Sequence, residues 1–220
     1  HTVCILGFNR SEWVIFDLAA MAIGAVPAGI YTTCSPIEVQ YIVDHSEAGV
    51  VLVENKGQWE KVEQERKRLP NLRHVVTMEG TEPLADEMVL TWQDFLANGD
   101  GVDDSIIDER LSNLLGEQLA TFIYTSGTTG PPKAVMLTHE NLSWTSAAAV
   151  DLVRMTDDDC SLSYLPLSHI AEQMFTLHVP ISVGSQVYFA QSLELLPENL
   201  KEVQPTVFFG VPRIWEKFYA

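Results

Sequence analysis

The chain has 220 residues, of which 46% are hydrophobic and 20% are charged. This is enough apolar material for one large domain or two small ones, and it excludes global disorder. The 13 basic and 30 acidic residues give a net charge of −17, which repels nucleic acid and anionic lipid at long range. A small anionic ligand is not excluded, because a loop of N–H groups and one lysine can hold phosphate inside an acidic protein.

Hydrophobic runs and turn signals predict alternating strands and helices. A strand at Val3–Leu6 precedes a helix at about 10–24, for which Asn9 and Glu12 form a start like a capping box. The alternation predicts an α/β fold with mainly parallel sheets flanked by helices. Further strands are predicted at 26–31, 50–54, 74–78, 119–124, 134–137, 161–165, 186–190 and 206–209, and further helices at 36–48, 58–69, 91–98, 141–154, 168–182, 193–203 and 213–220. Ser35 and Glu38 predict a capping box at the start of the helix 36–48, with Pro36 in its first turn.

The apolar stretch 13–31 could be mistaken for a membrane span. Asp17 would be costly in lipid, and Gly24, Pro27 and Gly29 break the second half of the stretch, so we predict no transmembrane segment. The three cysteines lack a CxxC pattern and are interpreted as reduced thiols, with no metal site. These features predict a cytoplasmic protein and leave peripheral membrane contact open. Because the chain begins without Met inside a predicted strand, we expect the natural N-terminus to lie upstream.

The segment from Thr125 to Lys133 contains only hydroxyl residues, Gly, Pro and Lys, and it directly follows a predicted buried strand. Glycine lets backbone N–H groups approach a ligand, hydroxyls can rotate toward phosphate oxygens, and Lys133 supplies a charge. Pro131 and Pro132 stiffen the end of the segment. The spacing matches neither a Walker A loop nor a nucleophile elbow. A simple Gly/Thr-rich turn needs two or three such residues rather than nine, so the sequence predicts a phosphate-binding loop.

Tyr124–Lys133 resembles the signature loop of the adenylate-forming superfamily, which includes acyl-CoA synthetases, luciferases and the adenylation domains of peptide synthetases. The resemblance implies a large domain of two sheets with helices and a small barrel, followed by a mobile C-terminal domain. The family usually has Gly where this chain has Ala134. The residues that the resemblance assigns to the ATP phosphates are Thr125, Ser126, Gly127, Thr128, Thr129, Gly130 and Lys133.

Tyr164–His169 is similar to the second core motif of the same family, which lies at the acyl-carboxylate end of the site. Ser168 is expected to cap the next helix, so that His169 lies at a helix N-terminus, which attracts anions. The alternative is a polar first-turn residue with no ligand. The resemblance implies that His169 and Lys133 are catalytic. His45 has no partner at a recognisable spacing and is predicted to be a scaffold residue.

The segments Gly29–Thr33, Ser161–His169 and Gly210–Lys217 resemble the long-chain fatty acyl-CoA synthetases of the bubblegum type. This resemblance implies an ATP-dependent ligase that forms an acyl-adenylate and then a thioester with CoA, with ATP, Mg²⁺, fatty acid and CoA as ligands. A coumarate-type ligase, a peptide-synthetase adenylation domain and a non-catalytic ATP-binding module stay open as alternatives. Residues 1–220 are expected to be part of the N-terminal adenylation domain, truncated at both ends and without the C-terminal domain, and therefore inactive alone.

Overall fold

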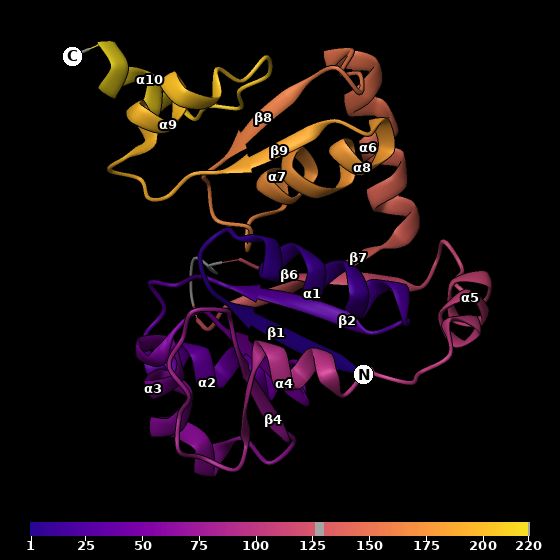
Figure 1. The fold of residues 1–220 in the computed structure, drawn as a ribbon, viewed down its shortest axis with the longest axis vertical. Coiled ribbons are helices and arrows are strands. Elements are labelled where there is room, and N and C mark those ends of the chain that lie inside the picture. Colours follow the sequence, from indigo (N-terminus) through magenta and orange to yellow (C-terminus); the bar gives the residue numbers. More distant parts are fainter. Residues whose placement is uncertain (126–129, 220) are drawn as a thin grey trace. The chain divides into compact units, whose positions relative to one another are not determined.

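The computed structural model describes residues 1–125 and 130–219, and these residues form two compact units (Figure 1). The first unit consists of His1–Leu142 and the short segment Pro166–His169. The second consists of Ser143–Leu165 and Ile170–Ala220. The chain therefore leaves the first unit, returns to it for four residues, and leaves it again.

Within the described residues, the first unit is built on a seven-stranded sheet in the order β5-β4-β3-β1-β2-β6-β7. All neighbouring strands are parallel except β7, which is antiparallel to β6 at the edge of the sheet. Because β2 and β3 lie on opposite sides of β1, the strand order reverses at the centre of the sheet. The strands are β1 (Thr2–Leu6), β2 (Val26–Ile30), β3 (Val50–Val53), β4 (His74–Thr77), β5 (Val89–Thr91), β6 (Leu119–Thr125) and β7 (Lys133–Thr138).

One face of this sheet is covered by α2 (Pro36–His45) and α3 (Lys56–Glu65). Alternate strand residues such as Cys4 and Leu6 point to this face and are fully buried, as expected for a parallel sheet covered by helices. The same core contains Ala28, Ile30, Val39, Ile42, Val43, Val51, Val53, Trp59, Val62 and Val75. The predicted capping box at the start of α2 is confirmed, with Ser35 Oγ accepting from the Glu38 N–H and the Glu38 carboxylate accepting from the Ser35 N–H.

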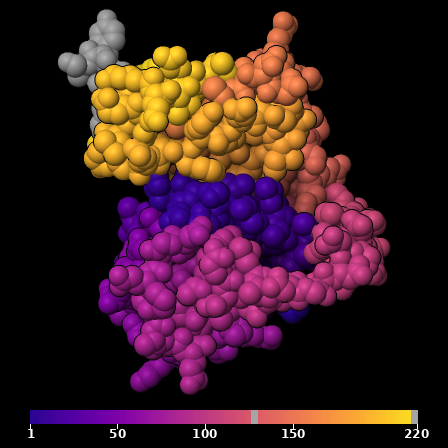
Figure 2. Space-filling view, viewed as in Figure 1, coloured from indigo at the N-terminus to yellow at the C-terminus, as the bar shows by residue number. Residues whose placement is uncertain are grey.

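The other face carries α1 (Ser11–Ala22) and α4 (Trp92–Ala97), whose aromatic rings Phe16 and Phe95 are 5.7 Å apart. The helix α5 (Asp104–Ser112) lies on the outside of the first unit and buries none of its residues (Figure 2). Neither α5 nor β5 was predicted from the sequence. A three-residue strand shows no alternation, and a helix with no buried face shows no apolar stripe directed at a core.

The start of α1 differs from the prediction. Arg10 rather than Asn9 occupies the N-cap position, and no side chain caps the helix there. The Asn9 side-chain oxygen accepts from the Leu167 N–H at 3.3 Å, and the Glu12 carboxylate accepts from the Glu79 N–H at 3.1 Å and pairs with Arg10. Both side chains bind distant segments, which a local pattern cannot reveal.

The second unit has a parallel pair of strands, β8 (Cys160–Ser163) and β9 (Gln186–Phe189). The predicted strand at 206–209 is wrong, because only Val207 forms an isolated bridge with Ser161. The predicted helix 168–182 is divided into α7 (Ile170–Gln173), a π-helical turn (Met174–His178) and α8 (Val179–Val183). The remaining helices are α6 (His139–Val153), which begins in the first unit, α9 (Leu196–Val203) and α10 (Pro212–Tyr219).

Glu172 organises the start of the helical segment in the second unit. Its carboxylate is 3% exposed and accepts hydrogen bonds from Ser163 Oγ at 2.7 Å, Thr176 Oγ1 at 3.0 Å and the Tyr164 N–H at 3.0 Å. Burial raises the pKa of this carboxyl group, and the hydrogen bonds oppose the rise. The carboxylate thus connects the end of β8 to the helical residues that follow.

In the part of the chain that the structure describes, no helix combines the length and apolar character needed to cross a membrane.

Asp17, on α1, has a buried carboxyl group with no hydrogen bond from the described residues to offset its loss of hydration. The residue is 1% exposed, and neither carboxylate oxygen has a hydrogen-bond partner among the described residues. Burial raises the pKa of this group from 3.8 to about 8. Between these values the folded protein binds a proton that the unfolded chain releases, so stability falls as the pH rises through this range and stays lowered above it.

We therefore expect Asp17→Asn to remove a pH dependence of stability. In the wild-type protein this group should lower the free energy of unfolding by up to about 1.4 kcal/mol per pH unit between about pH 5 and pH 8. Urea denaturation of the intact protein across this range measures the slope. Asp44→Asn, which changes an exposed carboxylate on α2, should keep the wild-type slope. Identical slopes for wild type and Asp17→Asn would contradict the expectation.

Candidate functional site

The predicted phosphate loop connects β6 to β7 at the carboxyl edge of the parallel strands. Thr125, the last residue of β6, is paired with Lys133, the first residue of β7, and both are exposed. The antiparallel pairing therefore fixes the two ends of the loop beside each other. Four of the predicted phosphate contacts lie outside the described residues, namely Ser126, Gly127, Thr128 and Thr129.

The described part of the loop contains one glycine that its conformation requires. Gly130 has a φ of +117°, a backbone conformation that residues with a side chain rarely adopt, while no atom of the described residues beyond its chain neighbours lies within 4 Å of the position its Cβ would take. Lys133 follows closely, and no carboxylate of the described residues forms an ion pair with it. Its positive charge is therefore not neutralised by the described part of the protein.

Ala134, where the family pattern usually has Gly, lies within the regular β6–β7 ladder opposite Tyr124. Its side chain is partly buried and packs against the hydrophobic core of the first unit. The additional methyl group therefore fits into ordinary strand geometry, and the strand pairing that positions Lys133 is intact.

The helix α2 contacts both ends of the loop. Tyr124, immediately before Thr125, is 4% exposed, and its hydroxyl lies 2.9 Å from His45 Nδ1. At the other end, the Tyr41 hydroxyl donates to the Pro132 carbonyl at 3.1 Å. Burial raises the pKa of Tyr124, which keeps this hydroxyl protonated and able to donate. His45 was predicted to be a scaffold residue without a partner at a recognisable spacing, and its partner Tyr124 is indeed distant in the sequence. The sequence signal was the i, i+4 spacing of two ring side chains on a helix with a predicted start.

The second motif reaches the same sheet through the segment Pro166–His169. Leu167 and Ser168 are 1% and 3% exposed, and this segment belongs to the first unit. Ser168 lies so close to β2 that a Cβ on Gly29 would be 2.7 Å from the Ser168 Cα. Gly29 is in register with Ile123 of β6. The structure thus brings the segment with His169 to β2, the strand adjacent to the one that ends in the phosphate loop.

His169 is exposed, and its N–H donates to the Pro166 carbonyl at 2.9 Å in a tight turn. The helix α7 begins at the next residue, Ile170, so His169 precedes a helix as predicted. The predicted cap by Ser168 is wrong. Ser168 lies one residue too early, and its side chain is packed against Gly29, with 3.1 Å between Ser168 Cβ and the position of a Cβ on Gly29.

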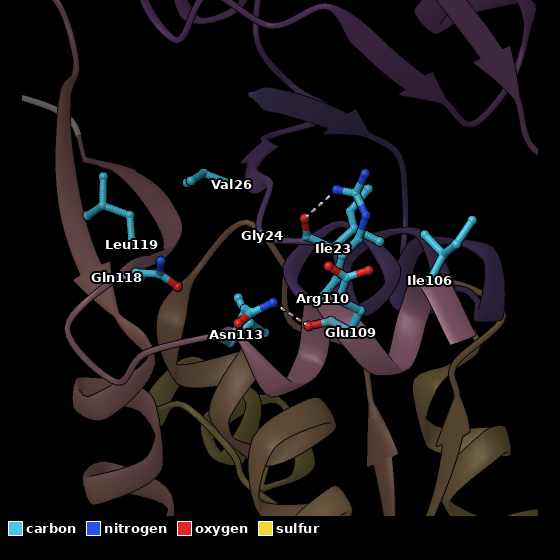
Figure 3. A pocket seen from close by; sticks show the side chains of 10 residues that line it. Ile23, Gly24, Val26, Ile106, Glu109, Arg110, Asn113, Gln118 and Leu119 are labelled. Carbon is cyan, nitrogen blue, oxygen red and sulfur yellow. Dashed lines mark hydrogen bonds between the residues drawn. The ribbon is translucent and has the colours of Figure 1, made fainter. Parts of the chain in front are cut away.

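A groove of about 550 Å³ lies elsewhere in the first unit (Figure 3). It is lined by the end of α1, by α5 and by the amino-terminal residues Val26 of β2 and Leu119 of β6. Arg110 donates to the Ile23 carbonyl at 3.2 Å in its wall. The groove is therefore at the opposite ends of β2 and β6 from the phosphate loop. Ligands of open α/β sheets bind at the carboxyl ends of the strands, so the groove does not belong to the candidate site.

The family described as "AMP-binding enzyme" matches residues 1–220, the whole chain. The chain belongs to this family of AMP-binding enzymes.

Curated relatives of this AMP-binding chain include the long-chain-fatty-acid–CoA ligase ACSBG2 of Xenopus laevis, with 42% identity over 99% of the chain and 30% of the relative. The human proteins of the same description are also similar. ACSBG2 of Homo sapiens is 40% identical over 100% of the chain and 34% of the relative, and ACSBG1 of Homo sapiens is 39% identical over 99% and 31%. The chain thus spans about a third of the length of these relatives.

Solved structures of the family share the fold. The anthranilate CoA ligase AuaEII in complex with anthranoyl-AMP superposes with a TM-score of 0.78 at 23% identity, covering 96% of this chain and 40% of that one. The long-chain-fatty-acid–CoA ligase FadD1 of Archaeoglobus fulgidus has a TM-score of 0.72 at 22% identity, covering 97% and 40%. At these identities the likeness establishes the fold, and it confirms the predicted α/β class.

The packing of Ser168 on β2 predicts the effect of Gly29→Ala. The new methyl group would lie 2.7 Å from a backbone carbon, so the segment Pro166–His169 must shift. We expect a loss of about 1–3 kcal/mol in unfolding free energy. We also expect faster hydrogen exchange at the Leu167 amide, because its hydrogen bond to Asn9 would lengthen.

Urea denaturation and hydrogen–deuterium exchange of the intact protein measure these two effects. Gly49→Ala is the matched control, since the nearest atom to its Cβ would be the Asn71 oxygen at 3.9 Å. Unchanged exchange at Leu167 in Gly29→Ala would show that the contact does not hold the segment.

Proposed function

We propose that the protein is an ATP-dependent long-chain fatty acid–CoA ligase, and that these residues contribute the phosphate loop and the acyl-carboxylate end of its active site. The observation that carries the proposal is the convergence of the two motifs on neighbouring strands, β2 and β6. The identity of 39–42% with long-chain-fatty-acid–CoA ligases supports the same conclusion. Residues 1–220 would form part of an N-terminal adenylation domain.

In the first half-reaction, a carboxylate oxygen of the fatty acid attacks the α-phosphorus of ATP. The new bond gives an acyl-adenylate, and the bond from the α-phosphorus to the bridging oxygen breaks to release pyrophosphate. Negative charge on the phosphates must be balanced while the two anions approach each other. The protein supplies positioning and charge neutralisation for this step.

In this proposal, charge neutralisation and positioning of the acid are carried out by two different segments near the carboxyl ends of the parallel strands. Lys133, without a carboxylate partner among the described residues, would bind phosphate oxygens together with the backbone and hydroxyl of Thr125. Gly130, three positions before Lys133, allows the positive φ that the chain adopts there. His169, exposed at the start of a helical segment, would face the carboxylate of the acid. The predicted contacts at 126–129 complete the phosphate site in this proposal.

In the second half-reaction, the sulfur of CoA attacks the acyl carbon of the adenylate. The thiol loses its proton, a thioester forms, and AMP leaves. Mg²⁺ enters this scheme with ATP as part of the substrate. Among the described residues, no group of three or more His, Cys, Asp or Glu side chains could hold a metal ion, and magnesium in such sites is bound largely by substrate phosphates. We place the protein in the cytoplasm, where ATP and CoA are available, and peripheral membrane contact stays open.

The role of Lys133 can be tested in the full-length protein. Because a charged hydrogen bond contributes about 1.5–3 kcal/mol, Lys133→Ala should reduce the rate of palmitate-dependent ATP–pyrophosphate exchange by roughly 10- to 150-fold. Fatty acid binding should change little. Lys67→Ala removes an exposed lysine far along the sequence and should leave exchange unchanged. Full exchange in Lys133→Ala would exclude its phosphate role.

The long-chain assignment predicts the choice of acid. Burial of each CH₂ group contributes about 0.8 kcal/mol, so a pocket that accepts a long chain should give palmitate a far higher kcat/KM than acetate. Thioester formation by the full-length protein across a series of saturated acids measures this preference. Equal efficiency with acetate and palmitate would contradict the long-chain assignment and leave adenylation intact.

A further inference from the structure

We infer that Tyr41 and His45 are positioning residues that hold the two ends of the phosphate loop against α2, and thereby increase the affinity for ATP. The inference rests on the proposed function, in which this loop binds the phosphates. Neither residue lies in the loop or in a motif that the sequence singled out. Their role follows from what each side chain contacts.

The helix α2 is a rigid support for these two side chains. Its first turn is closed by the capping box of Ser35 and Glu38. Its inner side is anchored in the core of the first unit by Val39, Ile42 and Val43, which are at most 2% exposed. Tyr41 and His45 are four positions apart and therefore lie on one side of the helix. Their rings stack with centroids 5.3 Å apart, so each restricts the other.

Tyr41 fixes the end of the loop. Its hydroxyl donates to the carbonyl of Pro132 at 3.1 Å. That carbonyl belongs to the same peptide plane as the N–H of Lys133, so the bond restricts the orientation in which the chain arrives at the lysine. Proline has no N–H of its own, and the carbonyl is the only backbone group through which this residue can be held by a hydrogen bond.

His45 fixes the start of the loop. Its Nδ1 lies 2.9 Å from the Tyr124 hydroxyl, and the two rings meet edge-to-face with centroids 5.8 Å apart. Tyr124 directly precedes Thr125 and is in register with Ala134 of β7. The hydrogen bond therefore connects α2 to the ladder from which both ends of the loop emerge.

The location of β7 explains why such support matters. Among the described strands, β7 is one of the two edge strands of this sheet and pairs only with β6, so one ladder alone fixes it to the sheet. The hydrogen bonds from α2 to Tyr124 of β6 and to Pro132, just before β7, attach these two strands to the helix as well. Because Thr125 and Lys133 are already held in place, less conformational entropy is lost when they bind a ligand, and this difference appears as affinity.

The test compares full-length variants by ATP–pyrophosphate exchange and by calorimetric titration with ATP. Tyr41→Phe removes only the hydroxyl and keeps the ring against His45. We expect the Kd and KM for ATP to rise roughly three- to tenfold, the value of one hydrogen bond, while the KM for palmitate and the thermal midpoint stay unchanged. His45→Ala should produce a similar rise, and His45→Asn should restore much of the affinity, because its amide can replace Nδ1 beside Tyr124.

The matched control is Tyr188→Phe on β9, which removes a tyrosine hydroxyl whose hydrogen bond is to Gln186. This variant should have the wild-type Kd and KM for ATP and the wild-type KM for palmitate. Tyr41→Phe combined with Lys133→Ala tests whether Tyr41 acts through the loop. If it does, Tyr41→Phe should have a much smaller effect in the Lys133→Ala background than in the wild type.

The results distinguish a failure of the proposed function from a failure of the inference about Tyr41 and His45. Wild-type protein that neither binds ATP nor exchanges pyrophosphate would refute the proposed function, and the inference with it. Normal exchange that depends on Lys133 but is unaffected by Tyr41→Phe and His45→Ala would refute the inference alone. Equal weakening for ATP and palmitate, with a lower thermal midpoint, would show that the pair only stabilises the fold and would also overturn the inference.

Discussion

The absence of a side chain at Gly29 is the constraint on which the candidate site depends. Ser168 can approach β2 only because Gly29 leaves room for its backbone, with a Cβ position 2.7 Å from the Ser168 Cα. The N–H of Leu167 then reaches Asn9, which fixes the segment from the other side. Because β2 pairs with β6, the same strand that receives Ser168 also aligns the start of the phosphate loop. One glycine and one strand pairing therefore bring two motifs, which are more than thirty residues apart in the sequence, to neighbouring strands.

The sheet also explains how an acidic protein can retain a positive charge for phosphate. Acidic side chains in the loops after the strands are engaged with backbone groups. Glu54, after β3, accepts from the Phe8 N–H at 2.9 Å, and Glu12 accepts from the Glu79 N–H while pairing with Arg10. Burial would raise the pKa of Glu12, but hydrogen bonds from its own backbone N–H and from Ser11, together with the charge and hydrogen bond of Arg10, lower it, so it stays ionised. With such carboxylates held elsewhere, no described ion pair neutralises Lys133.

The sequence predicted correctly those features that depend on neighbouring residues alone. The box of Ser35 and Glu38 gave the start of α2, and the run Val50–Val53 gave a buried strand. The resemblance placed both motifs, and the structure brought their described parts to adjacent strands. Asn9 and Glu12 were misassigned because their polar atoms are equally suited to a helix cap and to a distant backbone N–H, and tertiary packing decided between them. The same limit applies to Val207, whose apolar neighbours predicted a strand although it forms a single bridge.

The contacts of α2 show why the support of the site was harder to predict than the site itself. The predicted phosphate loop stands out in the sequence because phosphate binding would require an unusual composition in consecutive residues. Support requires only a hydroxyl or a ring nitrogen at the right place, and such groups are common on any helix. Tyr41 and His45 acquire their role from the sheet order, which places β6 and β7 beside α2, and from the register that leaves Tyr124 and Pro132 facing that helix. Residues of this kind can be recognised only when the backbone that they hold is known.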